Sequence, residues 1–142
     1  MKGRPAAAAA IALALAGCTG HTPATATVEV GAARFDVEVA VTADQQREGL
    51  SGRDQLDEGT GMLFTFAHDG QQQVWMAGMA IELDVAWISD GRVLDVLTLD
   101  PCTEPDQDQC PRWTSPGDVD ALLEVPAGSL TGVAAGDTVT VS

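Results

Sequence analysis

Apolar and polar residues alternate in the sequence from Phe35 onward, and this period of two restricts the fold more than any other feature. Between residues 35 and 42, one phenylalanine and three valines occupy every second position and would share one face of an extended strand. Met62, Phe64 and Phe66 repeat the pattern. We therefore expect strands with one buried face. Further strands are predicted over residues 74–76, 83–88, 93–99, 122–125 and 138–141.

Turn and cap residues separate these strands. Asp90-Gly91 lies between two apolar segments and is the strongest hairpin signal in the chain. Thr42 and Gln45 resemble a capping box, which predicts a short helix that ends near Leu50. No helical pattern alternates regularly with the strands. The sequence therefore favours a single mainly β domain, an antiparallel β-sandwich or barrel with one or two short helices.

The chain is strongly acidic. Its 142 residues suit one domain, and 7 Lys and Arg stand against 21 Asp and Glu, which gives a net charge of −14. A surface of this sign repels nucleic-acid phosphates, so we expect no nucleic-acid partner. A cationic ligand or a basic partner is compatible with it. We expect a monomer.

The first 17 residues are typical of a secretory signal peptide. Lys2 and Arg4 give a positive start, and the apolar run Ala6–Ala16 is too short to span a bilayer as a helix. The run ends in Leu15-Ala16-Gly17-Cys18, which resembles the lipobox of bacterial lipoproteins. An ordinary secretory signal with an incidental cysteine is the alternative. We predict a signal peptide over residues 1–17 that ends in a lipobox.

The lipobox resemblance implies that Cys18 is acylated and that lipid anchors the protein to a membrane. Thr19 follows the cysteine where Asp would favour retention at the inner membrane, so we expect the outer membrane, with the domain facing the periplasm. The next residues are small and polar. We predict a lipidated cysteine and flexible tether over residues 18–27 and a folded β-rich domain over 28–142.

Cys102 and Cys110 are the two cysteines of this domain. An exported protein meets an oxidising compartment, so the pair most simply forms a disulfide that closes a nine-residue loop. Their spacing differs from the C-x-x-C of redox sites. A zinc site would need more ligands than these two cysteines and the distant His68.

A series of short blocks runs along the domain: REGLSGR at 47–53, GMLFTF at 61–66, WM at 75–76, LDVAWI at 83–88, PC at 101–102, CP at 110–111, SP at 115–116, LEVPAG at 123–128 and GD at 136–137. In this order and spacing they resemble the bacterial and archaeal domain-of-unknown-function 192 family. The resemblance covers roughly residues 28–142. It implies a small β-rich fold, often exported, with no established biochemical activity.

Two positions depart from the pattern of that family. Its members commonly carry Lys-Asn after the Trp-Met pair, where this chain has Ala77 and Gly78. They commonly carry Pro where this chain has Glu82. A function that rests on the Lys and Asn side chains cannot operate here.

Arg53 is a candidate binding residue, because a guanidinium offers a fixed pair of donors to a carboxylate or a phosphate. It could hold an anionic ligand in a cleft beside Trp75. It could instead pair with a carboxylate such as Asp84 and fix the helix to the sheet, which is the interpretation we favour. Trp113, beside the cysteine loop, is the best exposed aromatic candidate for a sugar or peptide.

Metal and cofactor sites receive little support. Met76 and Met79 offer the thioether ligands that suit Cu(I), but methionine in apolar strands ordinarily fills a core. The acidic residues between the two cysteines lack the spacing of a calcium-binding loop. No catalytic motif surrounds His68. We predict no metal and no cofactor.

Together these features predict an exported, lipid-anchored small domain that is a binding or accessory module rather than an enzyme. Its binding candidates are Arg53, Trp75, Asp84 and Trp113, and its ligand would be a small molecule, a sugar or a peptide. The alternative is a hydrolase or other enzyme that uses Arg53 with nearby carboxylates.

Overall fold

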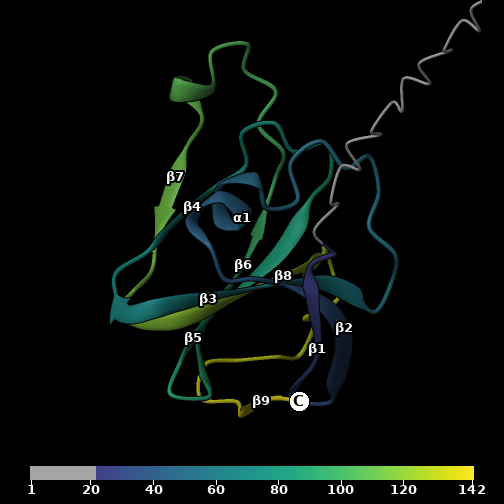
Figure 1. Ribbon diagram of the computed structural model, residues 1–142, viewed down its shortest axis with the longest axis vertical. Coiled ribbons are helices and arrows are strands. Elements are labelled where there is room, and N and C mark those ends of the chain that lie inside the picture. Colours follow the sequence, from purple (N-terminus) through teal and green to yellow (C-terminus); the bar gives the residue numbers. More distant parts are fainter. Residues whose placement is uncertain (1–21) are drawn as a thin grey trace, which may run out of the picture.

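The computed structural model describes residues 22–142, so the predicted signal peptide and Cys18 lie outside the described residues. Within the described range no helix is long and apolar enough to cross a bilayer. Figure 1 shows the elements, which are β1 (Ala24–Val30), β2 (Ala33–Ala40), α1 (Ala43–Glu48), β3 (Thr60–Gly70), β4 (Gln73–Trp75), β5 (Leu83–Ser89), β6 (Arg92–Leu99), the 3-10 helix η1 (Gln107–Gln109), β7 (Arg112–Thr114), β8 (Val119–Pro126) and β9 (Val139–Val141).

Seven strands form one sheet in the order β6-β5-β8-β3-β2-β1-β9, and β4 pairs with β7 in a separate ribbon. The prediction of a single, mainly β domain with short helices is confirmed. One detail differs, since β2 and β3 pair in parallel while the remaining neighbours are antiparallel. The connection from β2 to β3 spans residues 41–59 and contains α1. A parallel pair requires a crossover of about this length.

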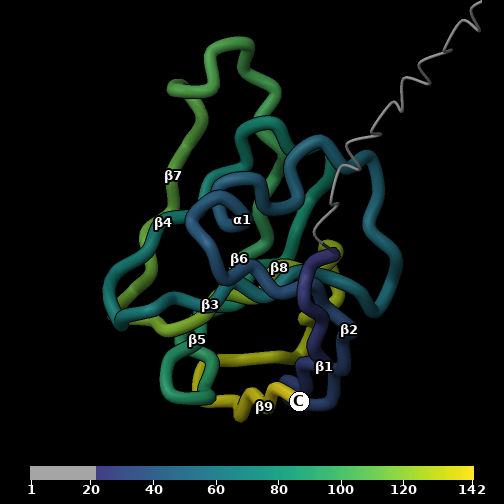
Figure 2. Tube along the Cα trace, viewed as in Figure 1, coloured from purple at the N-terminus to yellow at the C-terminus, as the bar shows by residue number. Residues whose placement is uncertain are grey.

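The sheet curls until its two edge strands meet at one end. Val93 N donates to Asp137 O at 2.9 Å, and Val139 N donates to Gly91 O at 2.8 Å, which joins the start of β6 to the approach to β9. Figure 2 shows the yellow C-terminal segment running from β5 across to β1. The sheet is therefore a half-barrel.

The predicted hairpin at Asp90-Gly91 is confirmed. It joins β5 to β6, and both of its central residues have positive φ, 50° at Asp90 and 67° at Gly91. A two-residue turn of this kind matches the right-handed twist of the flanking strands.

The two faces of the sheet carry two separate hydrophobic cores. Because side chains alternate along a strand, Leu123 and Val125 of β8 face the inside of the half-barrel, while Leu122 faces outward. Figure 1 places α1 and the β4–β7 ribbon over the outer side. The inner core comprises Val28, Val30, Phe35, Val37, Leu63, Ala86, Ile88, Val93, Leu123, Val125, Leu130 and Val139. The outer core comprises Ala40, Leu50, Met62, Phe64, Val74, Met76, Met79, Leu83, Val85, Trp87, Leu99, Val119 and Leu122.

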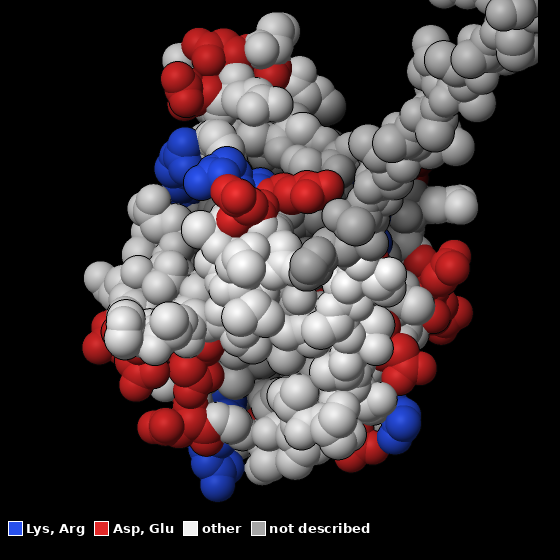
Figure 3. All heavy atoms as spheres, in the orientation of Figure 1, with Lys and Arg blue, Asp and Glu red and all other residues white. Residues whose placement is uncertain are grey.

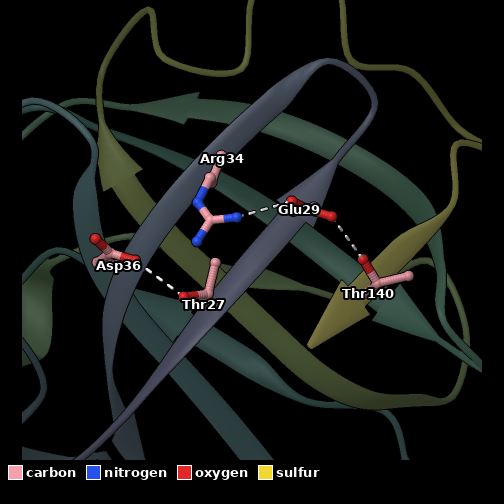
Figure 4. Close-up of polar contacts among 5 residues, drawn as sticks. All are labelled: Thr27, Glu29, Arg34, Asp36 and Thr140. Atoms are coloured by element: carbon pink, nitrogen blue, oxygen red, sulfur yellow. Dashed lines mark hydrogen bonds and ion pairs between the residues drawn. The ribbon is translucent and has the colours of Figure 1, made fainter. Parts of the chain in front are cut away.

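The first strand begins earlier than predicted. Residues 24–27 were expected to belong to a tether, but they pair with β2 as part of β1. Thr27 Oγ1 donates to Asp36 Oδ1 at 3.0 Å across this pair, and Arg34 pairs with Glu29 at 3.0 Å. Figure 4 shows these contacts, with Thr140 of β9 on the other side of Glu29. The folded domain therefore starts at Ala24, because the β2 backbone orders residues that have no apolar signal of their own.

Candidate functional site

Helix α1 and the β4–β7 ribbon lie over the outer core (Figure 1), and we call them the cover. Helix α1 is its first element. Thr42 Oγ1 accepts a hydrogen bond from Gln45 N at 3.2 Å, and Gln45 Oε1 accepts one from Thr42 N at 3.0 Å, which confirms the predicted capping box. A helix of six residues is too short to be stable alone. Gln46 Nε2 donates to Thr65 O at 2.8 Å and so fixes α1 to β3.

The turn after α1 contacts the segment after β4. Ser51 Oγ donates to Ala77 O at 3.3 Å, and Gly52 N donates to Gly78 O at 3.2 Å. Gly78 has a φ of 73°, a conformation that Gly and Asn adopt more readily than other residues. The Asn that family members commonly carry here would meet the same backbone requirement. The presence of Gly instead of Asn at position 78 therefore has a structural explanation that does not require the loss of a function.

A pocket of about 170 Å³ lies beneath this cover, between α1, the turn after it, β3, β4 and residues 76–79. Its buried apolar side chains come from the turn after α1, β3, β4, residues 76–79 and β8: Leu50, Phe64, Val74, Met76, Met79 and Leu122. Neutral polar groups from Gln46, Ser51, Gln72 and Gln73 also line it. The lining thus combines apolar side chains with polar groups that can orient a ligand, as small-molecule sites do.

Glu124 of β8 contributes a carboxyl to this pocket. It lies opposite Met62 of β3 and Val85 of β5, in the middle of the sheet, and only 6% of the residue is exposed. Among the described residues, none forms a hydrogen bond or an ion pair with its carboxyl group. Burial raises the pKa of Glu124 to about 7, from an ordinary value of 4.5. The side chain thus carries a proton for part of the time at neutral pH.

Two further charged residues, Arg47 and Glu48 of α1, line the pocket within the described part of the chain. Arg47 Nη1 donates to Asp44 Oδ1 at 2.7 Å, and the Arg47 side chain is 74% exposed. Its charge is therefore directed to solvent and to Asp44. Glu124 remains the one deeply buried charge of the pocket lining.

Trp75 of β4 is the predicted binding candidate that does line this pocket. The guanidinium carbon of Arg112, opposite it on β7, lies 3.9 Å from the centroid of the Trp75 ring. A cation at this distance is attracted to the aromatic face. The contact holds the indole and the β4–β7 ribbon together at the side of the pocket.

Arg53 lies elsewhere, and the expected pairing with Asp84 is wrong. Its Nη1 and Nη2 donate to Glu38 Oε1 and Oε2 at 2.7 and 2.8 Å. These hydrogen bonds hold the pKa of Glu38 below its ordinary value. The pairing follows from the crossover, because the chain that leaves α1 runs back past β2. Two hollows, of about 350 and 260 Å³, flank the Arg53–Glu38 pair.

Asp84 has a structural position inside the half-barrel. It is 3% exposed, accepts a hydrogen bond from Thr98 Oγ1 at 2.7 Å, and accepts another from Leu130 N at 2.9 Å. Both carboxylate oxygens are thus bonded, one to β6 and one to the loop after β8. Asp84 and Glu124 lie on opposite faces of the sheet, so the structure does not bring Asp84 to the pocket.

Trp113 lines a different hollow, of about 440 Å³, together with the loop between β6 and β7. Cys102 and Cys110 form a disulfide within this loop, which confirms that prediction. Glu104, Asp106 and Asp108 are exposed there. Figure 3 shows acidic side chains gathered at this end of the molecule. Of the four predicted candidates, the structure therefore places only Trp75 in the pocket that holds Glu124.

Within residues 22–142, no three His, Cys, Asp or Glu side chains come close enough to hold a metal ion. Met76 and Met79, which the sequence offered as thioether ligands, are buried in the outer core.

Sequence reasoning missed Glu124. The signal was present, because Glu124 is the single charged residue between Ala121 and Pro126 and alternation places it on the same face as Leu122. The alternation does not reveal that α1 and the β4–β7 ribbon cover that face. Without the cover, Glu124 would be an ordinary solvent-facing residue of a strand.

Comparison with known proteins assigns the chain to a family. The pattern of the DUF192 family, described as an uncharacterized ACR, matches residues 25–141. A solved structure from Sinorhizobium meliloti 1021, described as a proposed transcription regulator, is 27% identical, with a TM-score of 0.76 over 84% of this chain and 95% of that one. A protein of unknown function from Novosphingobium aromaticivorans DSM 12444 is 28% identical, with a TM-score of 0.72 over 98% of this chain and 99% of that one.

No curated protein sequence matches the chain. The family match begins one residue after the start of β1 and ends at the last residue of β9, so it covers the folded domain as the structure defines it. The expectation drawn from the sequence blocks is confirmed, and the chain belongs to the DUF192 family.

Proposed function

We propose that this protein is a binding module that takes a small molecule into the pocket containing Glu124. The observation that carries the proposal is the carboxyl group of Glu124: the residue is only 6% exposed, the carboxyl faces a cavity, and it forms no hydrogen bond or ion pair with the described residues. Buried charges in folded proteins are normally paired, because desolvation without a partner costs several kcal/mol. A site that retains such a group is suited to a ligand that supplies the partner.

We also propose that the module is exported and lipid-anchored. The Leu15-Ala16-Gly17-Cys18 sequence supports the anchor, and the disulfide between Cys102 and Cys110 suits an oxidising compartment. The anchor does not require the acidic surface to attract lipid, because two or more acyl chains give stable attachment by themselves. Facing the periplasm from the outer membrane, the domain would sample small molecules that enter the cell envelope.

The Sinorhizobium protein is described as a proposed transcription regulator, but we do not extend that role to this chain. A net charge of −14 opposes contact with nucleic-acid phosphates. The enzyme alternative built on Arg53 receives less support than binding. Both terminal nitrogens of Arg53 donate to Glu38, so the guanidinium is neutralised within the fold.

Ligand capture is tested by NMR titration of the exported chain with small organic molecules of about six to eight non-hydrogen atoms, since a cavity of about 150 Å³ accepts benzene. The wild type should show shifts at residues that line the pocket. Ala77→Leu should abolish them by filling the pocket, and family members that carry Lys at this position indicate that a longer side chain is tolerated. Ala32→Leu, in the exposed turn between β1 and β2, is the matched control. Binding that survives Ala77→Leu would contradict the proposed site.

The anchor is tested separately by Cys18→Ser. Wild-type protein should fractionate with membranes and incorporate labelled fatty acid, and the variant should do neither. Wild-type protein that carries no acyl chain would contradict the anchor and leave the binding proposal intact.

A further inference from the structure

We propose that the ligand of the Glu124 pocket is a small primary ammonium ion with an apolar body, whose N–H groups bind the Glu124 carboxylate. This inference rests on the proposed function and names the chemical class of the ligand. It follows from three properties of the pocket: the sign of its charge, the hydrogen-bonding capacity left open, and its size.

The negative charge of the pocket lining disfavours anionic ligands and favours cationic ones. The charged groups facing the cavity are Arg47 and Glu48 from α1 and Glu124 from β8, while β3, β4 and residues 76–79 present none. Arg47 is already paired with Asp44 at 2.7 Å. The buried part of the lining is therefore negative when Glu124 is ionised, and the chain as a whole adds a field of the same sign.

Hydrogen bonding favours an ammonium group over a metal ion. A divalent cation such as Ca²⁺ takes six or more oxygen ligands, and no cluster of three candidate metal-binding side chains occurs in residues 22–142. An ammonium nitrogen has three donors and needs only one carboxylate with a few neutral acceptors. The side-chain amides of Gln46, Gln72 and Gln73 line the same cavity and can supply acceptors.

The volume and the apolar lining of the pocket determine what the rest of the ligand, beyond its ammonium group, can be. A volume of about 170 Å³ holds about six to eight non-hydrogen atoms by comparison with cavities that accept benzene. Phe64, Val74 and Leu122 offer apolar contacts for a short hydrocarbon. A ligand with one cationic end and one short apolar end fits both parts of this lining.

The probes are three molecules that share a five-carbon tail: n-pentylammonium, 1-pentanol and hexanoate. They are titrated at pH 8 into the exported chain carrying Cys18→Ser, so that neither acyl chains nor detergent compete for them. The hydroxyl of 1-pentanol can donate one hydrogen bond to the Glu124 carboxylate, whereas an ammonium group has three donors and carries the opposite charge. We therefore expect n-pentylammonium to bind about tenfold or more tighter than 1-pentanol. Hexanoate should bind more weakly than both.

Glu124→Gln keeps the shape of the side chain and removes its charge. It should lower the affinity for n-pentylammonium to within about twofold of that for 1-pentanol, whereas Glu58→Gln, on an exposed loop, should change neither. A second measurement uses the wild type alone. Binding of n-pentylammonium should weaken between pH 8 and pH 5.5, as Glu124 takes up a proton, while binding of 1-pentanol should not weaken.

The outcomes separate the inference from the proposed function. Equal or tighter binding of 1-pentanol by the wild type, or an ammonium preference that persists in Glu124→Gln, would overturn the ammonium assignment and leave a small-molecule pocket. Absence of binding by all three probes would overturn the ammonium assignment. Together with a library titration in which Ala77→Leu has no effect, it would also overturn the proposed function.

Discussion

Gly61 of β3 lies so close to Glu124 of β8 that a Cβ atom at position 61 would collide with the carbonyl oxygen of Glu124. The next residue, Met62, is the direct partner of Glu124 in the antiparallel pair. Glycine at position 61 thus allows the close approach of the two strands beneath the pocket. The position of the Glu124 backbone depends on a residue that lacks a side chain.

We predict that Gly61→Ala destabilises the protein. The added methyl group must displace the backbone of β8, and overpacking of this kind costs about 1–3 kcal/mol. Urea denaturation of the variant and the wild type measures the difference. Gly70→Ala is the control in the same strand, because no atom lies within 4 Å of a Cβ built there. Equal stability of the two variants would contradict the prediction, because it would show that the β8 backbone moves aside without a loss of free energy of unfolding.

We predict that Glu124→Gln changes how stability depends on pH. The pKa of Glu124 is about 7 in the folded protein and 4.5 ordinarily, so the folded state binds the proton more tightly. The contribution of this tighter proton binding to the free energy of unfolding is fully present below pH 4.5 and is lost as the pH rises through 7. The loss amounts to about 3 kcal/mol, since each pKa unit corresponds to about 1.4 kcal/mol.

The measurement is urea denaturation at pH 5 and pH 8. When the pH rises from 5 to 8, the free energy of unfolding of Glu124→Gln should increase by about 2–3 kcal/mol relative to that of the wild type. The corresponding increase for Glu58→Gln should be less than about 0.5 kcal/mol. A pH-independent difference between wild type and Glu124→Gln would show that Glu124 is ionised without penalty and would remove the electrostatic argument for the pocket.

We predict that Arg53→Met costs about 1–2 kcal/mol at pH 7, because two charge-assisted hydrogen bonds to Glu38 are lost from a partly exposed site. Arg53 lowers the pKa of Glu38, so this contribution is present above the ordinary value of 4.5 and disappears as the pH falls through the lowered pKa. Urea denaturation at pH 7 and pH 3 should therefore show a smaller cost at pH 3.

Arg34→Met is the control for this pair. Arg34 and Glu29 form an ion pair whose side chains are 65% and 56% exposed, and its loss should cost about 0.5 kcal/mol or less. If Arg53→Met costs no more than Arg34→Met, Arg53 is free of a structural role and returns as a candidate ligand group.

We predict that replacement of both Cys102 and Cys110 by Ala lowers the free energy of unfolding by about 2–3 kcal/mol, the effect expected for a loop of nine residues. Urea denaturation measures the loss. Mass spectrometry of a non-reduced digest should also show the two cysteine peptides linked. Free thiols that react with an alkylating agent in the native protein would contradict the prediction.

Local sequence patterns predicted the elements that local interactions decide. The hairpin at Asp90-Gly91 and the cap at Thr42 depend on residues a few positions apart, and both were predictable. The start of β1 was not, because Ala24–Thr27 has small residues and its strand conformation comes from hydrogen bonds to β2. The parallel pairing of β2 with β3 depends likewise on a crossover whose path no local pattern specifies.

The site was predictable only in part, for the same reason. Trp75 was predicted to lie beside a cleft, and it does line the pocket, although Arg53 lies elsewhere. Glu124 was missed, since its burial depends on α1 and β4, which lie more than 45 residues away in the sequence. The partner of Arg53 was assigned wrongly because 21 acidic residues were available and composition does not choose among them. Burial and pairing are properties of the tertiary fold.

The early start of β1 has a consequence for the geometry of attachment. Residues 19–23 alone separate Cys18 from the sheet, and this length spans at most about 20 Å. Pro23 borders a hollow that it shares with Gln45 and Glu48 of α1, so the chain enters the domain beside the cover of the Glu124 pocket. An acylated Cys18 would therefore restrict the rotational freedom of the domain and keep the pocket near the lipid headgroups. Ligands concentrated at the bilayer surface would then lie within reach of the pocket.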